Sequence, residues 1–283
     1  MKRIKPSILA SGQIVGNYRV VRELLGRHYP PFYEALELPS NQPMLLYPVR
    51  PEMRTHIEAF RQQHQGLEHP ALPKIIPLNE LADGHWILAV VPPRGIPLNE
   101  LIDQSIQKQK PLGVHGLHLL VKIAEFFAYV HEHGVFSLRL HPKKLAVRFV
   151  NDEWFISNAD FSVVSIPLLD ARTEDLPQPN PEDEERGGKY YYRVKDPELD
   201  VYMLGVLAYE CLLGQRPVSD RSYDELRLHP RSVEHIPIEF LDPRMPVGLP
   251  QLVLRMLKGD PTMRPTMRQV HDELIHKLRD LGA

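Results

Sequence analysis

Hydrophobic and polar positions change their spacing about a third of the way along the chain. Up to about Val91, short apolar runs such as "NYRVVRELL", "PMLLYPVR" and "HWILAVV" are separated by turn signals such as Asp83-Gly84. Runs of this kind are typical of an antiparallel sheet. One helix is expected within this part, over Ile57–Leu67, because apolar side chains recur there at helical spacing.

Beyond the segment Val91–Gly95 the spacing becomes helical. Apolar residues follow the helical template in three stretches, at 117–128, 204–211 and 270–281. The stretch 162–189 follows neither period and carries the acidic run "PEDEE", which predicts a long exposed segment.

A β-rich first third followed by a mostly helical remainder predicts an α+β protein with two lobes. We expect the lobes at 14–91 and 92–283, with a hinge at about 91–95, and together they form one domain. The string "IPLNEL" occurs at 76–81 and again at 96–101. Its flanking sequences differ, so coincidence is a better interpretation than an internal repeat.

Composition narrows the class of protein. The 283 residues carry 34 Lys+Arg and 36 Asp+Glu, a balance that provides no general attraction for nucleic acid or an acidic membrane. Cys211 is the single cysteine, which excludes an intramolecular disulfide and a Cys-rich zinc site. No run of 18 apolar residues occurs, so we expect no membrane span and a soluble, cytoplasmic protein.

Several short strings resemble, in the same order, those of the eukaryotic-like (Hanks-type) Ser/Thr protein kinases of bacteria. They are "YRVVRELLGR…FYEA", "HEHGVFSLRLHPKKLAV", "ISNADFSVV", "DVYMLGVLAYECLLGQRP" and "MLKGDPTMRPT". The resemblance covers about residues 17 to 280. It implies a two-lobed protein-kinase-like fold, with an antiparallel β-rich N-lobe holding one main helix and a mostly helical C-lobe. Phosphoryl transfer in this family needs a Gly-rich loop, a lysine–glutamate pair, a catalytic aspartate, and an Asn and Asp that hold magnesium.

The N-lobe departs from the family pattern. Gly26 stands at the first glycine of the Gly-rich loop, but Pro30 and Pro31 follow, and proline has no amide proton to offer a phosphate. The alignment places Tyr47 at the lysine position and Phe60 at the glutamate position. A phenol is neutral near pH 7 and cannot neutralise phosphate charge. The resemblance therefore implies an apolar Tyr47–Phe60 contact in place of the buried ion pair.

The catalytic loop departs further. "SLRLHPKK" lies on HRDLKPEN, which puts Ser137 at the histidine, Arg139 at the catalytic aspartate, His141 at the lysine and Lys144 at the magnesium-binding asparagine. A guanidinium cannot accept the substrate proton, and an ammonium repels a metal ion. His141 has a suitable pKa for a base, but it stands two residues beyond the required position, so this is the lesser hypothesis.

Besides Gly26, three family positions are kept. Asp160, within "DFS", stands where the family holds magnesium. Two hypotheses remain: residual nucleotide and metal binding, or an ion pair with Arg139 or Lys144, which we favour because several cations surround one carboxylate. Asp200 stands at the helix aspartate that anchors the catalytic-loop backbone. Arg264 stands at the arginine that pairs with an Ala-Pro-Glu motif, which this chain lacks.

The leading hypothesis is a pseudokinase: a kinase-like signalling protein that binds a protein partner, as a scaffold or as an allosteric regulator of an active kinase or another regulator. No cofactor is expected, and ATP with Mg²⁺ is disfavoured. The expected partner surfaces are Ile57–Leu67, 162–189 and 218–248. Two alternatives stay open: an active Ser/Thr kinase with a displaced catalytic set, and a nucleotide-sensing module that binds ATP without turnover.

Overall fold

The structure is a computed structural model that divides into two compact units. Its described residues are 8–24, 32–49, 58, 62, 66–72, 75–80, 86–135, 140–158, 197–218, 221–228, 230–236 and 242–282. Described residues up to Pro93, apart from His69–Ala71, form the first unit. His69–Ala71 and the described residues from Arg94 onward form the second unit.

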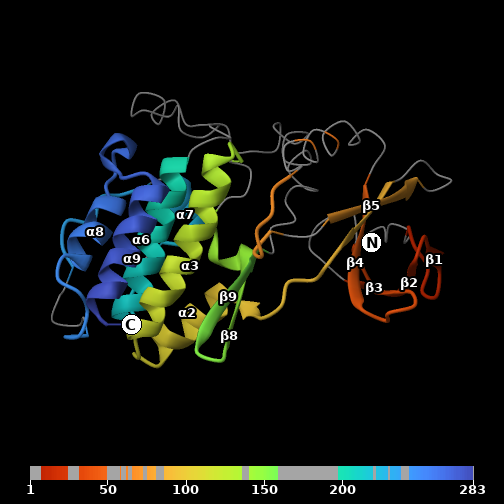
Figure 1. Ribbon diagram of the computed structural model, residues 1–283, viewed down its shortest axis with the longest axis horizontal. Coiled ribbons are helices and arrows are strands. Elements are labelled where there is room, and N and C mark those ends of the chain that lie inside the picture. Colours follow the sequence, from red (N-terminus) through yellow and green to blue (C-terminus); the bar gives the residue numbers. More distant parts are fainter. Residues whose placement is uncertain are drawn as a thin grey trace, which may run out of the picture. The chain divides into compact units, whose positions relative to one another are not determined.

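The first unit is built on a six-stranded antiparallel sheet (Figure 1), as the apolar runs predict. The strands lie in the order β1-β2-β3-β4-β6-β5. Their bounds are β1 Ile14–Val15, β2 Tyr18–Leu24, β3 Phe32–Glu37, β4 Pro43–Val49, β5 Ile75–Glu80 and β6 Trp86–Val90. Of the helix expected over Ile57–Leu67, Glu58 and Gln62 are helical, whereas Gly66 lies in a turn and Leu67 is not helical, so the helix ends before the predicted bound. The residues around Glu58 and Gln62 lie outside the described part of the chain.

Alternate side chains of the sheet form the core of the first unit. Tyr33 in β3 and its register partner Leu46 in β4 are both fully buried. The Tyr33 hydroxyl accepts hydrogen bonds from the main-chain N–H groups of Ile8 and Leu9, at 2.9 and 3.2 Å. This pairing satisfies a phenol oxygen that burial would otherwise leave without a partner.

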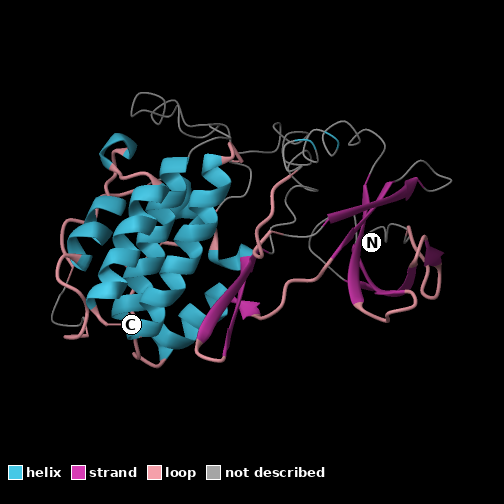
Figure 2. Ribbon diagram, viewed as in Figure 1, coloured by secondary structure: helices cyan, strands magenta, loops and turns pink. Residues whose placement is uncertain are grey.

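The second unit is mostly helical, with a small three-stranded sheet (Figure 2). The helices are α2 Leu98–Gln107, α3 Gly113–Glu132, α6 Pro197–Leu213, α7 Tyr223–Leu228, α8 Leu249–Met256 and α9 Met267–Asp280, with short 3₁₀ helices η2 Pro142–Lys144 and η5 Pro261–Met263. The sheet pairs β7 Ile96–Pro97, β8 Leu145–Val150 and β9 Glu153–Asn158. The three helices predicted from periodicity are α3, α6 and α9, whereas periodicity did not indicate α2, α7 and α8.

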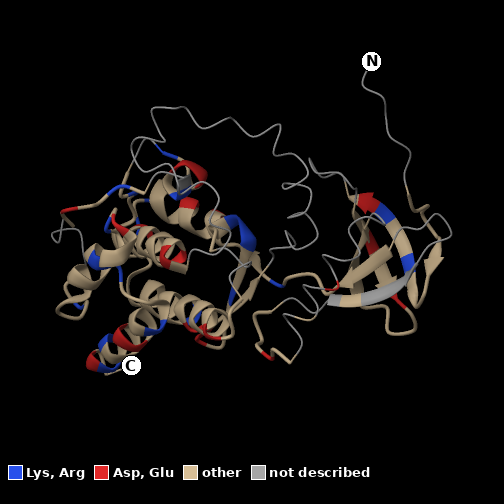
Figure 3. Cartoon of the chain, turned by 90° about the horizontal axis from the view of Figure 1, so that it is seen from above, with Lys and Arg blue, Asp and Glu red and all other residues tan. Residues whose placement is uncertain are grey.

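Helix α6 is the centre of the helical core. Every residue from Asp200 to Leu213 is buried, and α3 and α8 both pack against this helix. At Gly205, an added Cβ would lie only 2.9 Å from the Cβ of Met256, so glycine permits close packing beside the end of α8. Charged residues gather instead on outer segments such as α9, near the C-terminus (Figure 3).

Among the described helices, α3 alone is long and apolar enough to pass a membrane-span test. Its composition has a second explanation, because 61% of its most apolar window is buried inside the protein. It packs against α6 and α9. A helix that is apolar on most sides is expected at the centre of a helical core.

Candidate functional site

The main chain of Leu140, in the segment that resembles a catalytic loop, is held by buried charged side chains. Asp200, only 2% exposed, accepts a hydrogen bond from the Leu140 N–H at its Oδ1 atom, at 2.9 Å. Arg227 Nη1 donates to the Leu140 carbonyl at 3.1 Å and to Asp200 Oδ1 at 3.2 Å. His131 Nε2 lies 3.1 Å from Asp200 Oδ2. Both polar groups of one residue's main chain are therefore fixed.

Three helices supply these side chains. His131 comes from the last turn of α3, Asp200 from the first turn of α6 and Arg227 from the last turn of α7. Removing a carboxylate from water costs several kcal/mol unless it is paired and hydrogen-bonded. Here the Asp200 carboxylate has a main-chain donor, a guanidinium and an imidazole, which together offset that cost.

His141 is buried beside the same anchor. Its Nδ1 accepts a hydrogen bond from the Lys143 N–H at 3.1 Å and so caps η2. This leaves the ring proton on Nε2, which lies 3.4 Å from Asp224 Oδ1. The His141 and Tyr223 rings also pack edge to face, with their centroids 5.7 Å apart. Both ring nitrogens are thus engaged, which does not favour His141 as a general base.

The charge state of His141 follows from its surroundings. Burial lowers the pKa of His141, and the Asp224 carboxylate opposes that shift. The cations Lys144, Arg227 and Lys143 lower the pKa further. A neutral imidazole is the expected form, because both desolvation and nearby positive charge disfavour protonation.

A second buried carboxylate joins α6 to α7. The Glu210 side chain is 1% exposed and accepts a hydrogen bond from the Tyr223 hydroxyl at 2.7 Å. Arg216 Nε lies 3.7 Å from Glu210, and Arg216 Nη2 donates to Asp103 in α2 at 3.0 Å. Burial raises the pKa of Glu210 to about 7, although Tyr223 and Arg216 favour the charged form.

Tyr47, at the position of the family's lysine, lies in β4 and is partly buried. Its ring stacks on the Phe32 ring, with centroids 5.3 Å apart and planes 10° from parallel. Burial raises the pKa of the Tyr47 phenol above its ordinary value of 10.0, so the side chain is neutral. The expected contact with Phe60 stays a prediction, because Phe60 lies outside the described residues.

Most other predicted catalytic and binding positions also lie outside the described residues. These are Gly26, Ser137, Arg139 and Asp160. Lys144 is described and is half-buried at the end of η2. The ion pair of Asp160 with Arg139 or Lys144 therefore stays a prediction.

Arg264 binds main-chain carbonyl groups. Its guanidinium donates to Lys258 at 2.7 Å, to Gly259 at 2.8 Å and to Glu198 at 2.9 Å. It also lies over the Tyr202 ring, 5.0 Å from the centroid. The arginine thus ties the η5 region to the start of α6 and reaches the main chain of Pro197-Glu198, the dipeptide nearest to an Ala-Pro-Glu motif.

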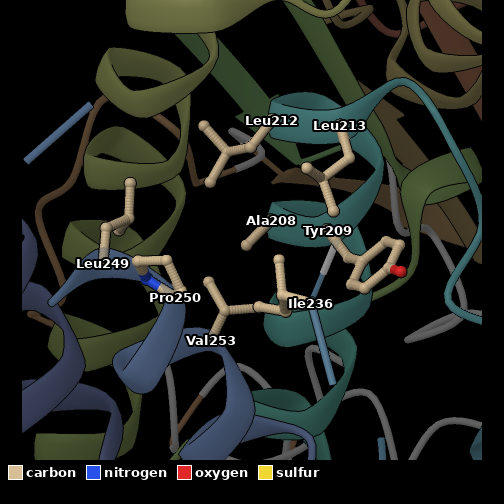
Figure 4. Close-up of a pocket in the computed structure, with 8 residues that line it drawn as sticks. All are labelled: Ala208, Tyr209, Leu212, Leu213, Ile236, Leu249, Pro250 and Val253. Atoms are coloured by element: carbon tan, nitrogen blue, oxygen red, sulfur yellow. The ribbon is translucent and has the colours of Figure 1, made fainter. Parts of the chain in front are cut away.

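The described residues show little that suits a metal or small ligand. Within that part of the chain, no three His, Cys, Asp or Glu side chains are grouped as metal ligands. A pocket of about 210 Å³, part of it open to solvent, lies between α6 and α8 (Figure 4). Its lining residues carry no charged group: Ala208, Tyr209, Leu212, Leu213, Ile236, Leu249, Pro250 and Val253. Without charged groups it offers no acid–base chemistry.

Sequence reasoning missed the side chains that join the helices here. Glu210 had a signal, because it is a lone carboxylate inside the apolar run "LGVLAYECLL". Tyr223 and Arg227 stand four residues apart in "YDELRL", which places them on one helix face. His131 is nearly buried and contacts Asp200, a pair that residue spacing does not indicate because the two residues lie 69 positions apart.

The sequence of the chain is similar to those of known protein kinases. No protein-family model matches the chain. It is 25% identical over 282 residues to the SNF1-like protein kinase ssp2 of Schizosaccharomyces pombe, covering 95% of this chain and 45% of that protein. It is 26% identical over 275 residues to the carbon catabolite-derepressing protein kinase of Candida glabrata, covering 94% and 42%. The chain thus spans less than half the length of these relatives.

Among solved structures, the chain is similar to the kinase domain of Mycobacterium tuberculosis PknI. The TM-score is 0.60 at 21% sequence identity, and the match covers 95% of this chain and 98% of that one. This similarity shows the fold: a curled antiparallel sheet in the N-terminal part and a helical remainder, as the sequence motifs predict.

Proposed function

We propose that this chain, which has a protein-kinase-like fold and is similar in sequence to Ser/Thr protein kinases, does not itself transfer phosphate. It acts instead as a protein-binding scaffold or as an allosteric regulator of an active kinase. One observation carries the proposal: Asp200 anchors the loop main chain at Leu140, while the same loop has Arg139 at the position of the catalytic aspartate.

Two described residues support the loss of chemistry. Tyr47 replaces the lysine that neutralises phosphate charge, and its partly buried phenol is neutral and stacked on Phe32. Lys144 replaces the asparagine that holds magnesium, and an ammonium group has no lone pair for a metal. Each lost group contributes separately to electrostatic stabilisation of the transition state.

A binding role fits what the sequence keeps. The chain has the apolar core of a kinase-like fold, the loop anchor Asp200 and the structural arginine Arg264, while its catalytic positions have changed. Because function belongs to particular sites and not to the fold, this fold can serve a binding role without catalytic groups. The regions Ile57–Leu67, 162–189 and 218–248 are the proposed partner surfaces.

A second candidate rests on Asp160, which is kept where the family holds magnesium. In this alternative the chain binds ATP and Mg²⁺ without turnover, or transfers phosphate with another group as base. Both forms need Asp160, so they share one test with the leading proposal.

The test compares thermal unfolding of the protein with and without millimolar ATP and Mg²⁺, followed by radiolabelled phosphate transfer to a generic protein substrate. We expect no rise in Tm and no transfer, because a ligand raises Tm only if it binds the folded state. Asp160→Asn is the informative variant, and Asp152→Asn, in the exposed β8–β9 turn, is its matched control.

Each outcome separates the hypotheses. A Tm rise without transfer, lost in Asp160→Asn and kept in Asp152→Asn, would establish nucleotide sensing. Transfer that depends on Asp160 would establish an active kinase and overturn the proposal.

A further inference from the structure

Helix α7 turns one face inward, although it belongs to a region proposed as partner surface. Tyr223 and Leu226 are 7% and 2% exposed, and the Arg227 side chain is 15% exposed. Tyr223 and Arg227, four residues apart, lie on the same side of the helix. Both reach groups in other elements: Tyr223 reaches α6, and Arg227 reaches the loop at Leu140.

The Arg227 guanidinium completes the anchor of the loop. Asp200 can hold only the N–H side of Leu140, because a carboxylate oxygen accepts and the Leu140 carbonyl also accepts. Arg227 supplies the missing donor, and its Nη1 atom binds both oxygens, of Leu140 at 3.1 Å and of Asp200 at 3.2 Å. Polar contacts surrounded by protein are stronger than the same contacts in water.

Three further contacts hold α7 where Arg227 can reach. The Tyr223 hydroxyl donates to buried Glu210 in α6 at 2.7 Å, and the Tyr223 ring lies against His141. Asp224 lies 3.4 Å from the outer nitrogen of His141. The inner nitrogen accepts from the Lys143 N–H at 3.1 Å. The segment Leu140–Lys144 therefore contacts α7 at two residues: Leu140 is hydrogen-bonded to Arg227, and His141 lies close to Tyr223 and Asp224.

We infer that Tyr223, Asp224 and Arg227 form a clamp, with which α7 holds the segment Leu140–Lys144 in one backbone conformation. Arg227 is the positioning residue of this clamp. The clamp covers His141, at the loop position of the family's lysine, so that side chain faces α7 rather than an incoming substrate. This inference does not depend on whether the loop carries chemistry, and it makes α7 the element through which an event at 218–248 would reach the loop.

Amide hydrogen exchange of the full chain tests the clamp. In Arg227→Gln we expect the Leu140 amide to exchange about 10- to 100-fold faster, as the loss of a charged hydrogen-bond partner predicts. Amides inside α3 and the middle of α6 keep their rates. Arg227→Lys, which restores a charged donor, recovers part of the protection. Arg255→Gln breaks an exposed ion pair with Glu273 and is the matched control, with no change expected at Leu140.

A second variant covers the case in which Arg227→Gln fails to fold. Asp224 is 75% exposed, so Asp224→Asn should leave the fold intact while loosening His141. We expect the Lys143 amide, which donates to His141, to exchange several-fold faster. Wild-type exchange at Leu140 in Arg227→Gln, or equal acceleration of every amide in the second unit, would overturn the clamp. Unchanged exchange at Lys143 in Asp224→Asn would overturn it as well.

Discussion

At the scale of single residues, buried charge distinguishes the second unit. Glu210 and Asp200 come from one helix, and both are almost fully buried. They have different partners: Asp200 meets a main-chain donor, an arginine and a histidine, whereas Glu210 meets a phenol and a more distant guanidinium. The weaker set of partners leaves desolvation as the largest effect on Glu210, and its pKa rises to about 7.

This raised pKa predicts a pH dependence of stability with a definite sign. The folded protein holds the Glu210 proton up to about pH 7, whereas the unfolded chain releases it near its ordinary pKa of 4.5. The contribution of Glu210 is fully present below pH 4.5 and is lost as the pH rises through 7. The free energy of unfolding should therefore fall by up to about 3 kcal/mol as the pH rises through this range, and in Glu210→Gln we expect this fall to disappear.

Urea unfolding at several pH values between 4 and 8 measures the effect. Glu100→Gln, at an exposed carboxylate in the first turn of α2, should keep the wild-type dependence. If Glu210→Gln followed the wild-type curve as well, burial of Glu210 would not govern this pH range. The effect of His141 on stability has the opposite sign, because the pKa of His141 is lowered in the folded protein. Its contribution to the free energy of unfolding is fully present above pH 6.5, the ordinary pKa of a histidine, and is lost as the pH falls.

At the scale of elements, local sequence decides where some helices begin. Thr266 caps α9: its hydroxyl accepts from the Gln269 N–H at 3.2 Å, and the Gln269 side chain accepts from the Thr266 N–H at 2.8 Å. This reciprocal capping box satisfies two donors at the start of the helix. Since α9 packs against α3, a helix end that frays would loosen the helical core.

Thr266→Ala is therefore expected to reduce the free energy of unfolding by about 1 kcal/mol, the usual cost of losing a capping hydroxyl. Thr262→Ala is the matched comparison, because its hydroxyl bonds to Asp260 in an exposed turn. That change should stay within about 0.5 kcal/mol. Chemical denaturation of both variants measures the difference, and equal losses would show that the cap contributes nothing beyond a surface hydroxyl.

The same local sequence can also form two different secondary structures in this chain. The string "IPLNEL" at 76–81 enters β5, where Ile76 pairs with Ala89 of β6. At 96–101 the same string forms β7 for two residues and then begins α2 at Leu98, which is fully buried. Propensities are the same in both copies, so the neighbouring elements decide between strand and helix.

At the scale of the whole molecule, the chain crosses between its two compact units more than once. His69–Ala71 belongs to the helical unit, although the residues on either side belong to the first. The His69 ring lies 5.1 Å from Phe126 and 5.2 Å from Tyr129, both in α3. The Ala71 carbonyl accepts from the Asn158 N–H of β9 at 2.8 Å. A short piece of chain thus completes the packing of the other unit.

His69→Ala should destabilise the helical unit by about 1–2 kcal/mol, because it removes two aromatic contacts and a bond that orients Ala71. The main-chain amide of Asn158 should undergo faster hydrogen exchange, because its acceptor, the Ala71 carbonyl, is held less firmly. His276→Ala, at an exposed position of α9, provides the baseline for losing an imidazole. If both variants lost the same free energy of unfolding, the segment His69–Ala71 would not support α3.

The sequence by itself determined the features that repeat along the chain or belong to one position. Short apolar runs separated by turn signals predicted the antiparallel sheet, and helical spacing predicted α3, α6 and α9. The order of motifs predicted the kinase-like fold, and that Tyr47, Arg139 and Lys144 differ from a catalytic set stays a prediction from the resemblance. The inferences on the fold succeed because side-chain direction follows from residue spacing.

Only the tertiary structure decided which charged groups meet. Asp200 binds Leu140 and His131, which are 60 and 69 residues away along the chain, and Arg227 reaches both Asp200 and Leu140. Periodicity cannot encode such pairs, because it reports which face a residue occupies and not what lies opposite. The raised pKa of Glu210 and the clamp of α7 arise when separate helices exclude water around the same few polar atoms, and that exclusion exists only in the folded chain.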